Sequence, residues 1–301
     1  IIYNIKFLSK MTDFKKILLG AFVATTLVAC GGSNNDDSPT PPQQSSNNVT
    51  LKFNNVMGST PLALGTEYTS NNQKIKFTEV KYVISDIYLV KSDGTKVPYN
   101  VDNLDKGATV VNLAKSETLS YVLEGIELGE YNKIILGFGV KSSLNTLDQQ
   151  KFPNFYAAAG ANDTKMHWEW GNGYRFTKLE GTYGDENKPL SIHTGSTVKG
   201  TRDDPKTYVP GVDAFRDVTL ELPSKMNVTP KSSPTITINA DWDKLLNGKT
   251  KITLSGNIPT VHHTQSMIPV VNNLAGEGRN LDGSYVDANY MGMFSVSKVE
   301  H

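Results

Sequence analysis

The chain has 301 residues, of which 38% are hydrophobic and 20% are charged, and its 30 basic residues balance its 30 acidic residues. A chain without net charge has no basic field to attract nucleic acid or anionic lipid, so we exclude a nucleic-acid partner. The only cysteine is Cys30, which excludes a disulfide framework and a metal site built from several thiolates.

The first thirty residues have the pattern of an export signal. We expect residues 1–10, which do not begin with methionine, to come from an over-extended reading frame, and residues 11–29 to be a signal peptide. Two lysines precede the apolar stretch 17–29, which is shorter than the roughly 20 residues that span a bilayer. Leu27-Val28-Ala29-Cys30 resembles the lipobox of bacterial lipoproteins, which implies cleavage before Cys30 and lipidation of its thiol.

Residues 30–48 hold the lipid anchor and a polar segment that predicts a disordered tether, because it has too few apolar residues to offset its ordering entropy. Asp36 and Asp37 lie close to the anchor, as in surface-displayed lipoproteins of some Gram-negative groups. We therefore expect a lipid-anchored protein of the cell envelope, held at the outer membrane and facing the periplasm or the cell surface.

Residues 49–301 are expected to form one domain, since no linker or low-complexity stretch interrupts them. Short β-type runs recur, and the alternation in 235–240 places Ile236, Ile238 and Ala240 on one face. The pattern predicts an all-β fold, an antiparallel β-sandwich with long loops and only short helical pieces. The expected strands are residues 49–53, 74–77, 84–90, 131–140, 174–180, 218–222, 235–240 and 251–255, and the expected short helices are residues 241–246 and 286–293.

The segment 144–165 lacks alternation and predicts a long loop, the kind of element that often carries function on a β-sandwich. No GxSxG, HExxH, P-loop or dinucleotide-binding glycine motif is present. We therefore expect no catalytic residues and no enzyme.

Aromatic residues are densest in Met166-His167-Trp168-Glu169-Trp170. In a strand, the two tryptophans would share one face, and His167 and Glu169 would share the other. One interpretation is an aromatic core strand with a solvent-facing histidine and glutamate. The other is that tryptophan and histidine border a metal or redox site.

The remaining candidate ligands are spread along the chain. His193 lies at a predicted strand end, and His262 and His263 end the strand-like run 257–261, shortly before Met267. Adjacent histidines of a strand point to opposite sides, so only one of this pair is available to a given site. Imidazole with a thioether sulfur suits copper, although a lone histidine is more commonly a hydrogen-bonded polar residue.

Together these segments resemble the MbnP-like family of secreted proteins over most of residues 50–296. The Trp-rich motif is the most specific match. The matching motifs are Leu51-Lys52-Phe53-Asn54-Asn55-Val56-Met57-Gly58, Pro61-Leu62-Ala63-Leu64-Gly65, Lys81-Tyr82-Val83-Ile84-Ser85-Asp86-Ile87-Tyr88-Leu89, Gly129-Glu130-Tyr131, Met166-His167-Trp168-Glu169-Trp170 with Leu179-Glu180-Gly181, Ile192-His193-Thr194-Gly195 and Asp287-Ala288-Asn289-Tyr290.

The resemblance implies an exported β-sandwich associated with copper. In that family histidines bind copper together with a tryptophan that a dihaem peroxidase of the MauG/MbnH type oxidises to kynurenine. Carried over to this chain, His193 is the best-matched ligand, followed by His263 or His262 and then His167. Trp168 and Trp170 become the candidate oxidised or site-lining aromatics. Relatives can carry a Trp-x-His pair where this chain has Phe53-Asn54-Asn55, so that version of the site is lost here.

Two functions follow from these patterns. The first is a non-catalytic exported lipoprotein that sequesters or delivers copper through two imidazoles, with the sulfur of Met267 or an aromatic neighbour completing the site. The alternative is a metal-free surface module that binds a carbohydrate or a protein by stacking on exposed Trp168, Trp170 and Tyr174. Convergence of His193 with a second histidine would favour the first, and exposed tryptophans would favour the second.

Overall fold

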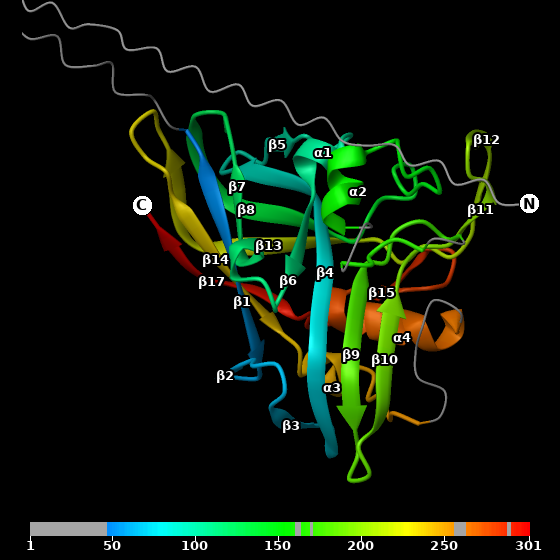
Figure 1. Ribbon diagram of the computed structural model, residues 1–301. Coiled ribbons are helices and arrows are strands. Elements are labelled where there is room, and N and C mark those ends of the chain that lie inside the picture. Colours follow the sequence, from blue (N-terminus) through cyan, green and yellow to red (C-terminus); the bar gives the residue numbers. More distant parts are fainter. Residues whose placement is uncertain (1–46, 160–163, 169–170, 256–262, 288–289) are drawn as a thin grey trace, which may run out of the picture. The chain divides into compact units, whose positions relative to one another are not determined.

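The structure is a computed structural model that describes residues 47–159, 164–168, 171–255, 263–287 and 290–301. Residues 44–301 form one compact unit, in which two β-sheets contain most of the described strands (Figure 1). Within the described ranges no helix is long and apolar enough to cross a membrane. The predicted signal peptide, Cys30 and nearly all of the predicted tether lie outside the described residues.

The first sheet is built around β1 (Val49–Met57). One edge of β1 pairs with β14 (Thr235–Asp241), which pairs in turn with the C-terminal β17 (Phe294–Glu300). The other edge pairs with β2 (Thr60–Pro61) and β7 (Ser120–Leu123). All of these pairs are antiparallel except β1 with β14, which is parallel and departs from the predicted pattern.

The second sheet is built around the 19-residue strand β4 (Gln73–Lys91), which joins the two expected strands 74–77 and 84–90. The strands lie in the order β10 (Lys188–Thr194), β9 (Thr177–Tyr183), β4, β8 (Gly129–Phe138) and β13 (Arg216–Val228). Along its length β4 also pairs with β3 (Glu67–Ser70), β6 (Thr109–Asn112) and β5 (Lys96–Tyr99).

The remaining elements are short, as predicted for a β-sandwich with long loops. They are α1 (Leu104–Gly107), the 3₁₀ helix η1 (Ser116–Leu119), α2 (Pro153–Ala159), β11 (Val198–Thr201), β12 (Asp204–Pro210), α3 (Lys244–Asn247), α4 (Thr264–Ala275), β15 (Gly278–Arg279) and β16 (Tyr285–Asp287).

Three predicted elements are corrected by the structure. Residues 251–255 form no strand beyond a single bridge from Lys251 to Asn247. The predicted helix 286–293 is wrong, because its first two residues belong to β16 and residues 290–293 are irregular. The predicted strand end at His263 is instead the N-cap of α4, in which Met267, Val271 and Leu274 recur at helical spacing.

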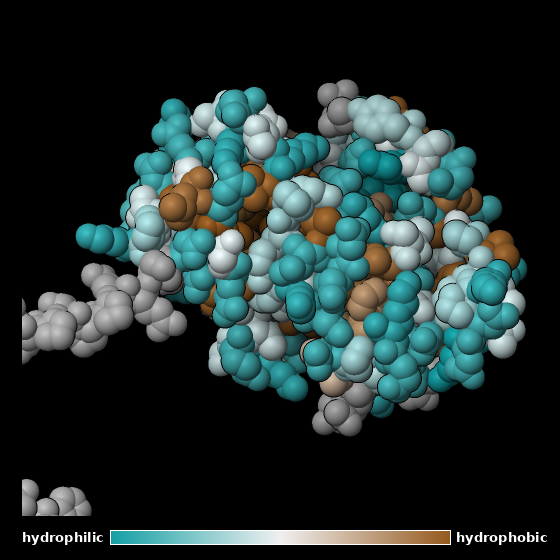
Figure 2. All heavy atoms as spheres, turned by 90° about the horizontal axis from the view of Figure 1, so that it is seen from above, coloured by the Kyte–Doolittle hydropathy of each residue, from teal (hydrophilic) through white to brown (hydrophobic). Residues whose placement is uncertain are grey.

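The apolar side chains form two separate cores on opposite faces of the second sheet. The core between the sheets includes Phe53, Ile84 and Ile238, and the second core includes Val83, Phe155 and Met267. Consecutive residues of a strand point to opposite faces, which is why Val83 and Ile84 enter different cores. Outside these cores, hydrophilic side chains cover most of the face seen in Figure 2, with smaller apolar patches between them.

The third tryptophan, Trp242, occupies the core between the sheets. Its indole is fully buried, its Nε1–H donates to Asn55 Oδ1 at 2.9 Å, and its ring lies 5.5 Å from that of Tyr82. Asn55 is 5% exposed. The departure Phe53-Asn54-Asn55 on the first strand therefore serves core packing in this chain.

We predict that Asn55→Ala lowers the free energy of unfolding by about 1–3 kcal/mol, because it leaves a buried indole N–H without its acceptor. Urea denaturation followed by tryptophan fluorescence measures this change. Asn54→Ala is the matched control, since the exposed Asn54 side chain bonds only to Asn239 across the sheet surface. Equal stabilities of the two variants would contradict the assigned role of Asn55.

Candidate functional site

The described part of the Trp-rich motif, Met166, His167 and Trp168, lies in no regular strand. His167 and Tyr174 make an isolated bridge, and the Trp168 N–H donates to Gly173 O at 2.9 Å. Met166, His167 and Trp168 are all buried, at 0%, 3% and 2% exposure. The predicted solvent-facing His167 is therefore wrong, while Glu169 and Trp170 lie outside the described residues.

Trp168 packs against the loop that follows β10. A Cβ at Gly195 would lie 2.9 Å from the indole Cζ3 atom and 2.8 Å from the carbonyl oxygen of Tyr174, so only glycine fits there without displacement. On the indole, the Arg175 guanidinium carbon lies 4.7 Å from the ring centroid, within cation–π distance. The Trp-rich motif and the Ile192-His193-Thr194-Gly195 motif thus meet through Trp168 and Gly195.

Asn145 joins the predicted long loop to these two motifs. Its Oδ1 accepts from the Tyr174 N–H at 2.9 Å, and its Nδ2 donates to Asn172 O at 3.1 Å and to Ser196 O at 3.4 Å. The side chain is 4% exposed, and Gly173 approaches it so closely that a Cβ there would lie 2.2 Å from Oδ1. The described residues of the segment 144–165, which include α2, therefore form a packed cover of the second core.

His167 is held inside this cover. Its Nε2–H donates to Thr146 O at 2.9 Å, and its ring meets those of Tyr174 and Tyr156 edge-on at centroid distances of 4.8 and 5.4 Å. Burial lowers the pKa of His167, so the imidazole is neutral at pH 7. Its buried Nδ1 has no hydrogen-bond partner within the described ranges.

His193 lies in different surroundings, on the outer face of β10, with Lys178 of β9 as its register partner. Its Nε2 lies 2.5 Å from Glu180 Oε1, and the Ser191 hydroxyl lies 3.3 Å from the same carboxylate oxygen. Burial raises the pKa of Glu180, but the hydrogen bond and charge of His193 and the hydrogen bond of Ser191 outweigh it and hold the pKa below its ordinary value. The carboxylate is therefore ionised and orients the imidazole.

The pair continues into a strip of alternating charge across β10, β9 and β4. We call Lys81, Glu79, Lys178, Glu180 and His193 the polar strip. Glu79 Oε1 lies 2.5 Å from Lys178 Nζ and 2.8 Å from Lys81 Nζ, and Lys81 is only 5% exposed. Burial raises the pKa of Glu79, yet the hydrogen bonds and charges of the two lysines outweigh burial and lower it.

The structure separates the other predicted ligands. His263 is exposed at the start of α4, whereas the Met267 side chain, four residues later, is fully buried in the second core. α4 contacts β10, so His263 and His193 belong to neighbouring elements. His262 lies outside the described residues.

No group of three or more His, Cys, Asp or Glu side chains suited to a metal ion occurs within the described part of the chain. His193, oriented by Glu180, supplies one imidazole. The residues fit a copper ion only if a second imidazole reaches His193, and His263 precedes α4, a helix that contacts β10.

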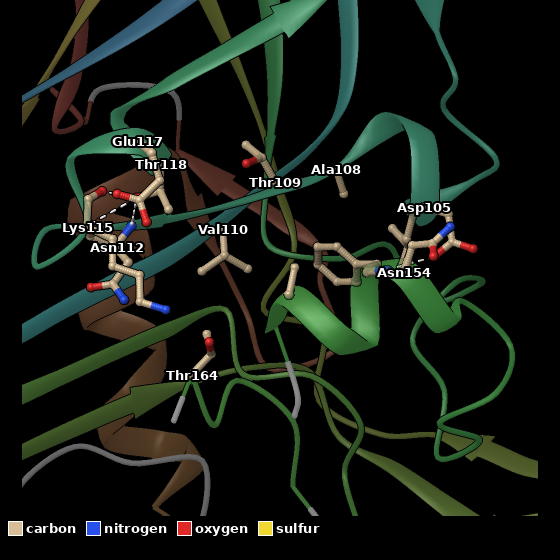
Figure 3. A pocket seen from close by; sticks show the side chains of 13 residues that line it. Asp105, Ala108, Thr109, Val110, Asn112, Lys115, Glu117, Thr118, Asn154 and Thr164 are labelled. Carbon is tan, nitrogen blue, oxygen red and sulfur yellow. Dashed lines mark hydrogen bonds between the residues drawn. The ribbon is translucent and has the colours of Figure 1, made fainter. Parts of the chain in front are cut away.

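A hollow of about 300 Å³ lies elsewhere, beside α1, α2, β6 and η1 (Figure 3). None of the predicted site residues lines it. Asp105 at one end accepts from the Phe155 N–H at 2.8 Å and so holds the first turn of α2. The hollow is therefore not part of the histidine site.

Sequence reasoning missed two residues, Glu180 and Asn145. Glu180 belongs to the matched motif Leu179-Glu180-Gly181, and period-two alternation along β9 places it on the outer face with Lys178. That alternation could have paired it with His193 once the strand register was known. Asn145 lies in a segment without periodicity and gives no such signal.

We predict that Asn145→Ala loosens the cover of the second core and lowers the free energy of unfolding by about 1–3 kcal/mol, because Tyr174 N–H and two carbonyls lose their buried partner. Hydrogen exchange of the peptides over 142–176 measures the local effect, with the exposed Asn154→Ala as control. Unchanged protection of these peptides would contradict the joining role of Asn145.

Comparison with known proteins gives the family. A comparison with curated proteins finds no match. The structure is similar to that of MbnP from Methylosinus trichosporium, with a TM-score of 0.57 and 14% sequence identity, over 84% of this chain and 99% of that one. At this identity the likeness establishes the sandwich fold alone. The model of the MbnP family matches residues 46–264, more than half of the chain, and the chain therefore belongs to the MbnP family.

Proposed function

We propose that this protein is a non-catalytic, exported copper-binding protein of the cell envelope that sequesters or delivers copper through histidines. The observation that carries the proposal is the contact of 2.5 Å between His193 Nε2 and Glu180 Oε1. It lies within a motif matched to the family, and the resemblance to that family implies a role in copper handling.

The carboxylate determines which ring nitrogen can bind a metal. Because Glu180 accepts a hydrogen bond from Nε2–H, the neutral imidazole of His193 carries its lone pair on Nδ1. A carboxylate behind an imidazole fixes the tautomer and increases the basicity of the ligating nitrogen. His193 is therefore oriented as a ligand, and imidazole is a ligand type that suits copper.

The second ligand is assigned to the pair at 262–263. His263 is exposed and precedes α4, which contacts β10. Met267 faces the second core from the first turns of the same helix and does not complete the site in this arrangement. His167 is a less suitable ligand, because its Nε2–H is bound to a carbonyl and its ring is enclosed by two tyrosines.

Two other functions receive less support. Trp168 and Tyr174 are buried, so neither can stack on a carbohydrate or a protein surface. Ser191, His193 and Glu180 lie together, but both partners approach the same nitrogen, Nε2, of the imidazole. A hydrolytic triad needs the acid and the nucleophile at different ring nitrogens, so this trio does not relay a proton.

The proposal also includes export to the cell envelope and a partner enzyme. The lipobox at Cys30 and the polar segment after it support a lipid-anchored protein at the outer membrane. A dihaem peroxidase of the MauG/MbnH type is the proposed partner, with Trp168 or Trp170 as its target. Incubation with such a peroxidase, followed by mass analysis of the peptide that holds both tryptophans, tests this step. A kynurenine mass shift supports the partnership, and an unchanged peptide contradicts it.

We predict that the protein binds Cu(I) in competition with a chromogenic chelator and that His193→Ala abolishes this binding. Glu180→Gln should weaken binding by about 10–100-fold, because the imidazole loses its orienting acceptor. Ser191→Ala, which keeps both residues, serves as the control. His301 is removed from all variants, since a terminal histidine can bind metal by itself. Wild-type affinity in His193→Ala, or no binding above background in the wild type, would overturn the proposal.

A further inference from the structure

Asp86 is an unusual residue in the middle of β4. Its backbone has φ of +48°, a conformation that residues other than glycine rarely adopt inside a strand. The pairing of β4 with β8 breaks here, passing from Ser85 directly to Tyr88. Its side chain is only 2% exposed, which is rare for an aspartate. Strained backbone and a buried carboxyl group together point to a functional position.

The partner of this carboxyl group is Lys141, which follows β8. Lys141 Nζ lies 2.5 Å from Asp86 Oδ2, yet neither carboxyl oxygen has a partner in hydrogen-bond geometry within the described ranges. The amine is thus in contact with the carboxyl group without lying along the direction of a good hydrogen bond. Gly137 permits this approach, because a Cβ there would lie 2.8 Å from both Asp86 Cβ and the Phe215 ring.

A second carboxyl group lies at the same place. Asp217 of β13 lines a hollow of about 230 Å³ together with Asp86, Lys141 and Tyr88. Burial and the negative charge of Asp86 raise the pKa of Asp217, so it holds a proton more readily than an ordinary aspartate. The Lys141 amine lies 5.8 Å from the Tyr88 ring centroid and 6.0 Å from that of Phe215. The Lys141 amine, the buried Asp86 carboxyl group and the exposed Asp217 carboxyl group therefore line one hollow.

We propose that Lys141 and Asp86 condense into an intramolecular amide cross-link, with Asp217 carrying the proton. A proton passes from the ammonium to the carboxylate, giving a neutral amine and a carboxylic acid. Nζ attacks Cγ of Asp86 and forms the N–C bond. Protonated Asp217 gives its proton to the departing hydroxyl and then takes one from nitrogen, the C–O bond breaks, and one water leaves. The net change is loss of water from the ion pair, with no oxidant and no second substrate.

The fold favours this reaction in two ways. The fold holds the Lys141 amine in contact with the Asp86 carboxyl group, so amide formation is a unimolecular step. This proximity can account for a large part of the lowering of the activation barrier. The carboxyl group is also only 2% exposed, so little water reaches its carbon to reverse the reaction. Burial lowers the pKa of Lys141, but the hydrogen bond and charge of Asp86 outweigh it and raise the pKa, so loss of the ammonium proton is the costly first step. The finished bond joins β4 to the segment after β8. It closes the chain between Asp86 and Lys141 and so lowers the entropy that this part of the chain loses on folding.

Peptide mapping of the purified full-length chain tests the cross-link independently of how the N-terminus is processed. Trypsin cannot cleave after an acylated Lys141, so residues 134–151 should stay intact and be joined to residues 82–91, at the sum of their masses less one water. Fragmentation should place the bond between Asp86 and Lys141. Separate peptides 82–91 and 134–141 in full yield would overturn the proposal and leave the pair as an ion pair.

Two variants make the test specific. Lys141→Arg keeps the positive charge but has no primary amine, so it should fold with the wild-type circular dichroism spectrum, lack the joined peptide and melt at a lower temperature. Asp217→Asn removes the proton carrier and should leave most of the chain unlinked. A joined peptide formed as completely in Asp217→Asn as in the wild type would overturn the role assigned to Asp217.

Discussion

The double-sided burial of β4 is the constraint on which the rest of the structure depends. A strand with two buried faces needs a separate apolar partner on each side. The first sheet supplies one, through Phe53 and Ile238, and the segments around α2 and α4 supply the other. The long loop at 144–165 is therefore part of the fold, because without it Val83 and its neighbours on the outer face would be exposed to water.

The matched motifs divide their work between packing and chemistry. Trp168, Gly195 and Asn145 fix the cover over the second core through direct contacts. His193 and Glu180 lie on the outward face of the same strands, in the polar strip. A single motif, Ile192-His193-Thr194-Gly195, thus contributes a core side chain, a candidate ligand and a packing glycine. These three residues are constrained for different physical reasons.

The fold class was predictable from the sequence, because the alternation of apolar and polar residues along a strand is a local property that can be read without knowing the tertiary structure. The alternation over 235–240 is matched by β14, where Ile236, Ile238 and Ala240 are buried. Prediction from the sequence was wrong where contacts between distant parts of the chain determine the local structure. His167 is buried where it bridges Tyr174, a contact that no local pattern predicts. α4 is a different case, because Met267, Val271 and Leu274 do recur there at helical spacing. The parallel pairing of β1 with β14 joins residues far apart in the chain and has no local signal.

The candidate site was predictable only in part, for a related reason. Residue type and motif single out His193, but its partner Glu180 becomes a neighbour only through the register of β9 with β10. Registers are set by the whole sheet and by its turns, so pairs across strands cannot be read from spacing along one segment. Met267 shows the converse, since its type suits copper while its helix turns it into the core.

The enclosure of Trp168 has a consequence for its reactivity. The indole is 2% exposed, under a cover that is held by Asn145 and α2 and that is distinct from the core between the sheets. Parts of a folded chain can unfold locally as cooperative units, and the free energy of such a local opening lies below that of global unfolding. A reagent that must contact the ring can react only while this cover is open. The rate of modification of Trp168 therefore depends on the equilibrium constant for local opening of the cover. Sequence changes in the cover, remote from the indole itself, then act as the kinetic control of that reaction.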